Sequence, residues 1–191
     1  FESLKKKISS WLGKEKEEGI FSGWRDVSLN KRGFRDAKIV ALRLKDKKIG
    51  LAFRSKLLRS KQTLNEVLKF HPECKKIIID NRIIEKNYGK LQGKTHLSIV
   101  ERLGTDKYDK FHRDYKARPP DGESIEDVEK RVLNFLRDLI KLMKKEKVNV
   151  AVSAHGNSMR PFRRYFEKFS VQEMCTIYND YEKVYTYNID V

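Results

Sequence analysis

The sequence of 191 residues has only two cysteines, four prolines and no long hydrophobic run. Cys74 and Cys175 belong to no CxxC pair, so neither a disulfide framework nor a zinc site is predicted. No apolar run approaches the roughly 20 residues that span a bilayer, and no signal peptide is visible. We therefore expect a cytoplasmic protein that does not cross a membrane. Internal repeats and linker-like stretches are also lacking, which favours a single domain over residues 1–191.

Acidic residues are in deficit. The 43 lysines and arginines outnumber the 27 aspartates and glutamates, which gives a net charge of +16. Such a field attracts anions, so nucleic acid, anionic lipid and small phosphorylated metabolites are all candidate partners. The chain has no RNP-type aromatic motif, KH loop or zinc finger, so nucleic acid is not favoured. A basic binding protein stays open as an alternative.

Strand and helix patterns alternate along the chain. This alternation predicts an α/β protein, a three-layer α/β/α sandwich with a mostly parallel central sheet. Ser124 is expected to cap the longest helix, with Asp127 three positions on as a near capping box. The predicted strands are 49–54, 77–79, 148–153 and 184–189, and the predicted helices are 1–20, 33–45, 56–69, the one after Ser124 and the one after His155.

Three polar residues follow three of the predicted strands. Arg59 follows strand 49–54, Glu85 follows strand 77–79 in an irregular loop, and His155 follows strand 148–153. In open parallel sheets, ligands bind at the carboxyl ends of the strands, and a helix N-terminus after His155 favours anions. Each residue also has a purely structural interpretation: a surface arginine, a loop salt bridge and a turn histidine. Their shared placement favours a phosphate-binding crevice.

Five segments carry a resemblance to a known family: 21–27, 54–64, 85–93, 118–124 and 154–160. In their residues, order and spacing they resemble the cofactor-dependent phosphoglycerate mutases of the histidine phosphatase superfamily. The resemblance implies interconversion of 3-phosphoglycerate and 2-phosphoglycerate in glycolysis and gluconeogenesis through a phosphohistidine. It also implies 2,3-bisphosphoglycerate as phosphoryl donor, no metal, and a homo-oligomer. A phosphatase of the same superfamily is the close alternative.

The resemblance also assigns roles to residues. Arg59 matches the arginine that clamps the moving phosphoryl group, Glu85 the proton donor and acceptor, and His155 the histidine that stabilises the transferring charge. The implied substrate-binding residues are Ser22, Gly23, Lys86, Tyr88, His96, His112, Arg113, Gly156 and Asn157.

Several positions depart from the family pattern. Lys86 and His112 stand where the family has arginines, and His96 stands where it has a lysine. The family's opening strand, which ends in Arg-His-Gly and carries the nucleophilic histidine, has no counterpart here. Either the protein is a pseudo-enzyme, or that strand is encoded upstream of Phe1. Because a buried sheet would lose ladder bonds without the strand, we favour the second explanation and expect the strand between 49–54 and 148–153.

Overall fold

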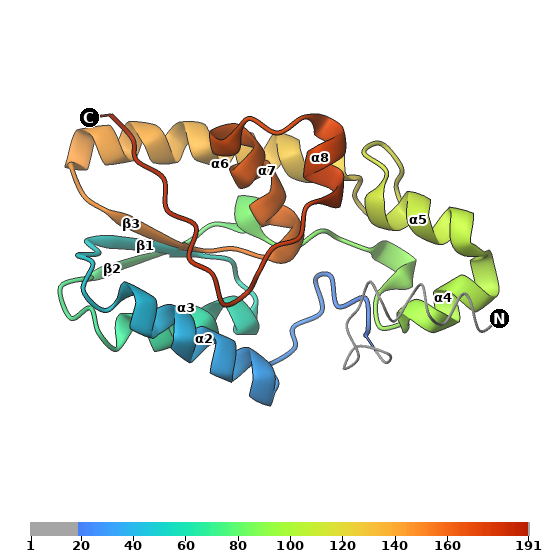
Figure 1. The fold of residues 1–191 in the computed structure, drawn as a ribbon, viewed down its shortest axis with the longest axis horizontal. Helices are drawn as coiled ribbons and strands as arrows, with labels where there is room; N and C mark the ends of the chain where they lie inside the picture. The colour runs from blue at the N-terminus through green and yellow to red at the C-terminus, as the bar shows by residue number, and fades with distance from the viewer. Residues whose placement is uncertain (1–18, 191) are drawn as a thin grey trace.

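A computed structural model describes residues 19–190 (Figure 1). The helix predicted for residues 1–20 falls almost entirely outside this range. No helix within the described part of the chain is long and apolar enough to cross a membrane. The α-helices are α2 (Lys31–Leu44), α3 (Leu58–Leu68), α4 (His96–Leu103), α5 (Thr105–Arg113), α6 (Ile125–Glu146), α7 (Gly156–Glu167) and α8 (Val171–Thr176), with short 3-10 turns η1 (Asn81–Ile83) and η2 (Gly89–Leu91).

The sheet consists of three parallel strands in the order β2-β1-β3, namely Lys76–Ile79, Leu51–Arg54 and Val150–Ser153. In the middle strand, Leu51 stands opposite Lys76 on one side and opposite Val150 on the other. This direct pairing contradicts the expectation of a further strand between β1 and β3. The error has a physical reason: an apolar run identifies a strand but does not specify which neighbour it pairs with.

The open position is instead the outer edge of β3. No residue between 19 and 190 pairs with that edge, and all four residues of β3 are half-buried, not buried on both faces as predicted. The predicted final strand at 184–189 is also wrong, because the backbone there is irregular. A strand needs a partner for its N–H and C=O groups, and no strand among residues 19–190 pairs with this segment. It packs through side chains, with the Tyr187 ring stacked 4.3 Å from that of Phe166.

Helices cover both faces of the sheet, which confirms the three-layer α/β/α architecture (Figure 1). Helices α6 and α7 lie on one face, and α2 and α3 lie on the other. The core between the sheet and α6 includes Phe53 and Phe135, whose rings meet edge to face at 5.1 Å. The predicted apolar stripe of α6 is confirmed as well: it is buried at Ile125, Val128, Val132, Phe135 and Leu139, and Leu142 packs half-buried against the core.

Helix α6 begins where the sequence predicts. The Ser124 hydroxyl accepts a hydrogen bond from the Asp127 N–H at 3.1 Å, and the Asp127 carboxylate accepts one from the Ser124 N–H at 2.9 Å. This capping box satisfies N–H groups that the helix itself cannot pair.

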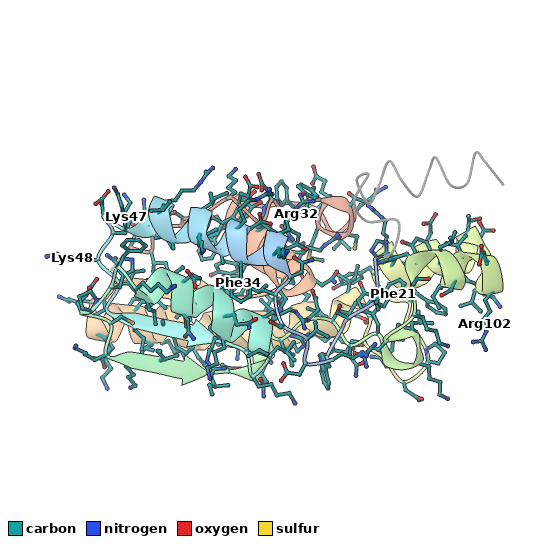
Figure 2. All side chains as sticks on the ribbon, turned by 90° about the horizontal axis from the view of Figure 1, so that it is seen from below. Phe21, Arg32, Phe34, Lys47, Lys48 and Arg102 are labelled. Carbon is teal, nitrogen blue, oxygen red and sulfur yellow. The ribbon has the colours of Figure 1, made fainter. Side chains whose placement is uncertain are left out.

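Helices α4 and α5 form a smaller unit beside the three layers, with its own apolar cluster. Phe21 lies where this unit meets the layered part (Figure 2). Its ring packs 4.6 Å from Tyr88 and 4.1 Å from His96. The irregular segment before α2 therefore joins the α4–α5 unit to the loop that contains Glu85.

Candidate active site

The carboxyl ends of β1, β2 and β3 lie at one edge of the sheet because all three strands are parallel. The segments that leave this edge carry Arg59 in the first turn of α3, Glu85 in the loop after η1, and His155 at the start of α7. The structure brings these three side chains together, since Glu85 interacts electrostatically with both Arg59 and His155.

His155 is 7% exposed, and its Nε2 lies 2.7 Å from the Ser55 hydroxyl oxygen. Its backbone N–H donates to the Ser158 hydroxyl at 2.9 Å, which fixes the start of α7. Burial lowers the pKa of His155 to about 4; Glu85 opposes the shift, while Arg59 and Arg131 add to it. The imidazole is therefore neutral at pH 7 and can contribute a hydrogen bond but no charge.

Glu85 faces the N-terminus of α7. Its Oε1 accepts a hydrogen bond from the N–H of the next residue, Lys86, at 2.7 Å and another from the Asn157 N–H at 3.1 Å. The Asn157 amide also donates to the Tyr88 hydroxyl at 3.2 Å, and Tyr88 is 6% exposed. A carboxylate held by backbone N–H groups at a helix N-terminus is oriented for proton exchange with a bound hydroxyl.

Arg59 links α3 to the segment before α2. Its guanidinium donates to the Gly23 carbonyl at 2.7 Å and to the Arg25 carbonyl at 3.0 Å. Burial lowers the pKa of Arg59, and the carboxylates of Glu85 and Asp26 counteract this. A guanidinium has more N–H donors than these two bonds use, so Arg59 can also bind an anion.

The segment around Ser22 and Gly23 is shaped by a glycine-specific turn. Gly23 has φ +49°, and a Cβ at this position would collide with the Gln92 side chain. Gln92 in turn accepts a hydrogen bond from the Trp24 N–H at 2.6 Å, and the Trp24 indole donates to the Glu85 carbonyl at 2.6 Å. This segment therefore forms one wall of the site beside half-buried Ser22.

Sequence reasoning missed Ser55 and Arg131. Arg131 reaches from α6 to the carbonyls of Arg82, Ile84 and Glu85 at 2.7–3.0 Å, and it also pairs with Glu123. It thereby holds the Glu85 loop against α6. Contacts of a side chain with backbone carbonyls leave no pattern in the sequence, so no sequence signal could have identified this residue.

Lys86 occupies the interior beside the site. It is fully buried, and its ammonium donates to the Phe111 carbonyl near the end of α5 at 2.8 Å and lies 5.1 Å from the Tyr88 ring centre. Burial lowers the pKa of Lys86 to about 8. The side chain thus ties the Glu85 loop to α5. In this structure it makes a structural contact, and its predicted role as a substrate-binding residue stays a prediction.

His96 and His112 lie in the aromatic cluster behind Tyr88. His96 Nδ1 is 2.9 Å from the Tyr108 hydroxyl, and its ring centre is 5.7 Å from that of His112. Burial, together with the neighbouring His96 and the cations around the cluster, lowers the pKa of His112 well below its ordinary value. His112 therefore adds no positive charge where the family pattern has an arginine.

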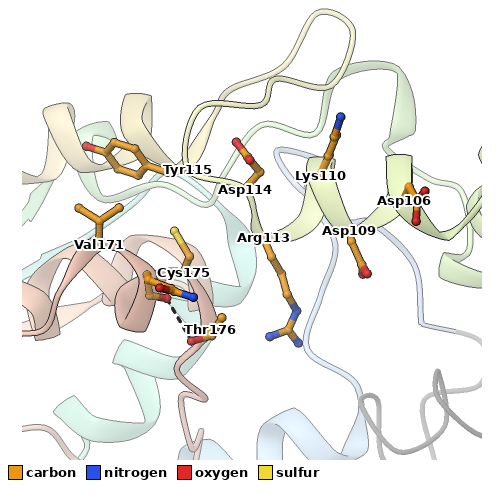
Figure 3. A pocket seen from close by; sticks show the side chains of 10 residues that line it. Asp106, Asp109, Lys110, Arg113, Asp114, Tyr115, Val171, Cys175 and Thr176 are labelled. Atoms are coloured by element: carbon orange, nitrogen blue, oxygen red, sulfur yellow. Dashed lines mark hydrogen bonds between the residues drawn. The ribbon is translucent and has the colours of Figure 1, made fainter.

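Arg113 lies in a separate pocket of about 660 Å³ between α5 and α8 (Figure 3). Arg59, Glu85 and His155 do not line it. Arg160 connects the two regions: it interacts electrostatically with Glu85 and Arg113, and it donates to the Met174 and Cys175 carbonyls.

The site has the features of an anion-binding centre. Arg59 supplies a guanidinium, and the start of α7 at Gly156 supplies the positive end of a helix dipole. Glu85 places a carboxylate beside these groups. Among residues 19–190, no group of three or more His, Cys, Asp or Glu side chains could hold a metal ion.

The chain is similar in sequence to proteins of a known family. Residues 10–190 match the sequence model of the histidine phosphatase superfamily (branch 1). A 2,3-bisphosphoglycerate-dependent phosphoglycerate mutase of Chlamydia abortus is 33% identical over 187 residues, which cover 84% of this chain and 82% of that protein. Its namesake from Cytophaga hutchinsonii is 32% identical over 160 residues, which cover 84% and 75%.

Solved structures show the same fold. A mycobacterial glucosyl-3-phosphoglycerate phosphatase has a TM-score of 0.70 at 22% identity and covers 82% of this chain and 75% of that chain. The alpha-ribazole phosphatase from Shigella flexneri has a TM-score of 0.67 at 21% identity, with coverage of 82% and 75%. At these identities the likeness shows the fold alone.

Proposed function

Because the chain belongs to the histidine phosphatase superfamily, we propose that it acts as a phosphoglycerate mutase. It would interconvert 3-phosphoglycerate and 2-phosphoglycerate through a phosphohistidine, in glycolysis and gluconeogenesis. The observation that carries the proposal is the meeting of Arg59, Glu85 and His155 at the N-terminus of α7. The names of the relatives, at about 30% identity over most of the chain, support the mutase over other reactions of the superfamily.

Each group has a defined task in this proposal. Arg59 and the positive end of the α7 helix dipole attract the phosphoryl oxygens, and neutral His155, bonded to Ser55, lines the site without a buried charge. Glu85 exchanges a proton with the substrate hydroxyl. Phosphoryl transfer depends chiefly on such positioning and charge stabilisation. The same donors fit 2,3-bisphosphoglycerate, which supplies a phosphoryl group when bound.

The nucleophile needs a separate source. The four histidines of the chain are His71, His96, His112 and His155, and of these only His155 lies beside Arg59 and Glu85. His71 follows α3 and precedes β2, which puts it at the opposite edge of the sheet. We propose that the nucleophilic histidine belongs to a strand that pairs with the open outer edge of β3. A strand at that edge would end close to His155, because β3 itself ends at Ser153.

The first test is an assay of a protein that contains both this chain and the proposed strand with the nucleophilic histidine. It starts from 3-phosphoglycerate and follows 2-phosphoglycerate and free phosphate together. Arg59→Met should lower isomerisation by at least about 100-fold, because a donor aimed at the transferring group is lost. Arg43→Met, at an exposed position of α2, is the control and should change nothing. Unchanged isomerisation in Arg59→Met would contradict the proposal.

Two alternatives give different outcomes in the same experiment. A phosphatase is favoured by the burial of Lys86 and the neutrality of His112, which leave fewer cations to retain a doubly phosphorylated intermediate. It would release phosphate without isomerisation. A pseudo-enzyme would bind 3-phosphoglycerate without turnover, and labelled 2,3-bisphosphoglycerate would leave no acid-labile phosphate on the protein.

A further inference from the structure

The segment that follows α8 is anchored against the first turn of α7. Asn179 is 8% exposed, and its amide donates to the Gly156 carbonyl at 2.6 Å. The Arg163 guanidinium donates to the Tyr178 carbonyl at 2.8 Å. The Glu182 carboxylate lies 3.7 Å from the guanidinium of Arg35 in α2. Figure 1 shows this segment running from α8 toward α2, in front of the sheet. The turn at residues 180–183 is thus fixed from two sides next to the candidate active site.

Tyr181 lies in this turn, and its hydroxyl points at the site. A Cβ built on Gly156 would lie 2.9 Å from the Tyr181 hydroxyl oxygen and 3.7 Å from Glu85 Oε2, so both oxygens face one point at the start of α7. Tyr181 also interacts electrostatically with Arg59. Burial and the Glu85 carboxylate raise the pKa of Tyr181 to about 12, so its hydroxyl keeps its proton at neutral pH.

The ring of Tyr181 has a second effect. The hydroxyl is turned inward beside Gly156 and Glu85, whereas the residue as a whole is 55% exposed, so its ring lies at the surface next to the start of α7. A wall of this kind limits the size of what can reach Arg59 and Glu85. Because a hydroxyl that keeps its proton can donate to an anionic oxygen, the same side chain can also bind the ligand.

On the basis of the proposed function, we propose that Tyr181 determines substrate specificity. Its ring would limit access on the α7 side of the candidate site, and its hydroxyl would donate a hydrogen bond to a substrate oxygen beside Glu85. The substrates it admits are short phosphorylated hydroxy acids of the size of glycerate. Phosphate esters of sugars or other large groups are excluded by the ring.

The test measures binding, so it does not depend on turnover. Calorimetric titration of the full chain with 3-phosphoglycerate and with glucose 6-phosphate would give Kd for each. Tyr181→Phe should weaken binding of 3-phosphoglycerate by about ten- to a hundredfold, the effect of one lost hydrogen bond to an anion. Tyr181→Ala should improve the relative affinity for glucose 6-phosphate by about tenfold, because the wall is removed.

Tyr178→Ala is the matched control, because Tyr178 is 69% exposed in the same segment. It should leave both Kd values unchanged. If the wild type binds 3-phosphoglycerate but both Tyr181 variants show the same Kd values as Tyr178→Ala, this inference is overturned and the proposed function is left intact. Failure of the wild type to bind 3-phosphoglycerate would overturn both. Tyr181→Phe keeps the ring, so its result stands even where Tyr181→Ala does not fold.

Discussion

At the scale of single residues, the candidate site separates charge from hydrogen bonding. His155 is buried against Ser55 and is neutral at pH 7, so the positive charge of the candidate site comes from Arg59 and from the start of α7. A second protonated group beside Arg59 would repel it in a poorly hydrated site. The neutral imidazole adds a directed hydrogen bond and avoids that repulsion.

This neutrality predicts a pH dependence of stability. The pKa of His155 falls from its ordinary value of 6.5 to about 4 on folding, so between these values the unfolded chain binds a proton that the folded chain does not. The free energy of unfolding should therefore rise with pH across this window, by at most about 3 kcal/mol. This contribution of His155 to stability is lost as the pH falls toward 4. Urea unfolding at pH 4.5 and 7.5 of the wild type and His155→Asn would measure it. An equal pH dependence in both proteins would contradict the assignment.

At the scale of elements, the sequence predicts what depends on local patterns. The apolar runs of β1, β2 and β3 and the cap at Ser124 are local, and the rule that ligands bind at strand ends led to Arg59, Glu85 and His155. Strand pairing is not local, so the position between β1 and β3 and the final strand were predicted wrongly.

For a related reason, the sequence does not predict that Lys86 points into the interior or that Arg131 anchors the Glu85 loop. Both side chains bind backbone carbonyls of distant segments, and any residue type offers the same carbonyl. Such contacts are determined by the three-dimensional path of the chain. The residues that hold the site in place were therefore harder to find than those that face it.

Arg131 gives the prediction at this scale. Arg131→Met removes the donors that hold three carbonyls of the Glu85 loop on α6, and it breaks the ion pair with Glu123, which keeps only its hydrogen bond from the Asn87 N–H. Urea unfolding should show a loss of about 2 to 4 kcal/mol, together with weaker binding of 3-phosphoglycerate.

Lys130→Met is the control for Arg131→Met. Its neighbouring ion pair with Glu126 is more exposed to solvent, so its loss should cost less than about 0.5 kcal/mol. Equal effects of the two substitutions would show that Arg131 is not an anchor of the loop.

At the scale of the whole molecule, the described sheet has two open edges with different surroundings. The edge of β3 lies next to helix α7 of the candidate active site, whereas β2 forms the other edge of the sheet and carries apolar side chains. Ile77 is 45% exposed and Ile79 is 53% exposed on this strand. A free edge with exposed apolar residues favours pairing with another chain. We propose that two copies of this chain pair through β2, which would give the homo-oligomer that the family resemblance implies.

A twofold axis at β2 would bring the same residues of both copies together. A charged side chain introduced at Ile77 or Ile79 would therefore lie close to the same charge in the second copy. The net charge of +16 on each chain opposes association, and salt screens this repulsion beyond roughly 8 Å at physiological ionic strength. Analytical ultracentrifugation should therefore detect a dimer that strengthens with salt, and the double variant Ile77→Lys with Ile79→Lys should be monomeric. Leu42→Lys, at a residue of α2 that is 56% exposed, should remain dimeric. A wild type that is monomeric at every salt concentration, or a Leu42→Lys variant that dissociates equally, would exclude β2 as the interface.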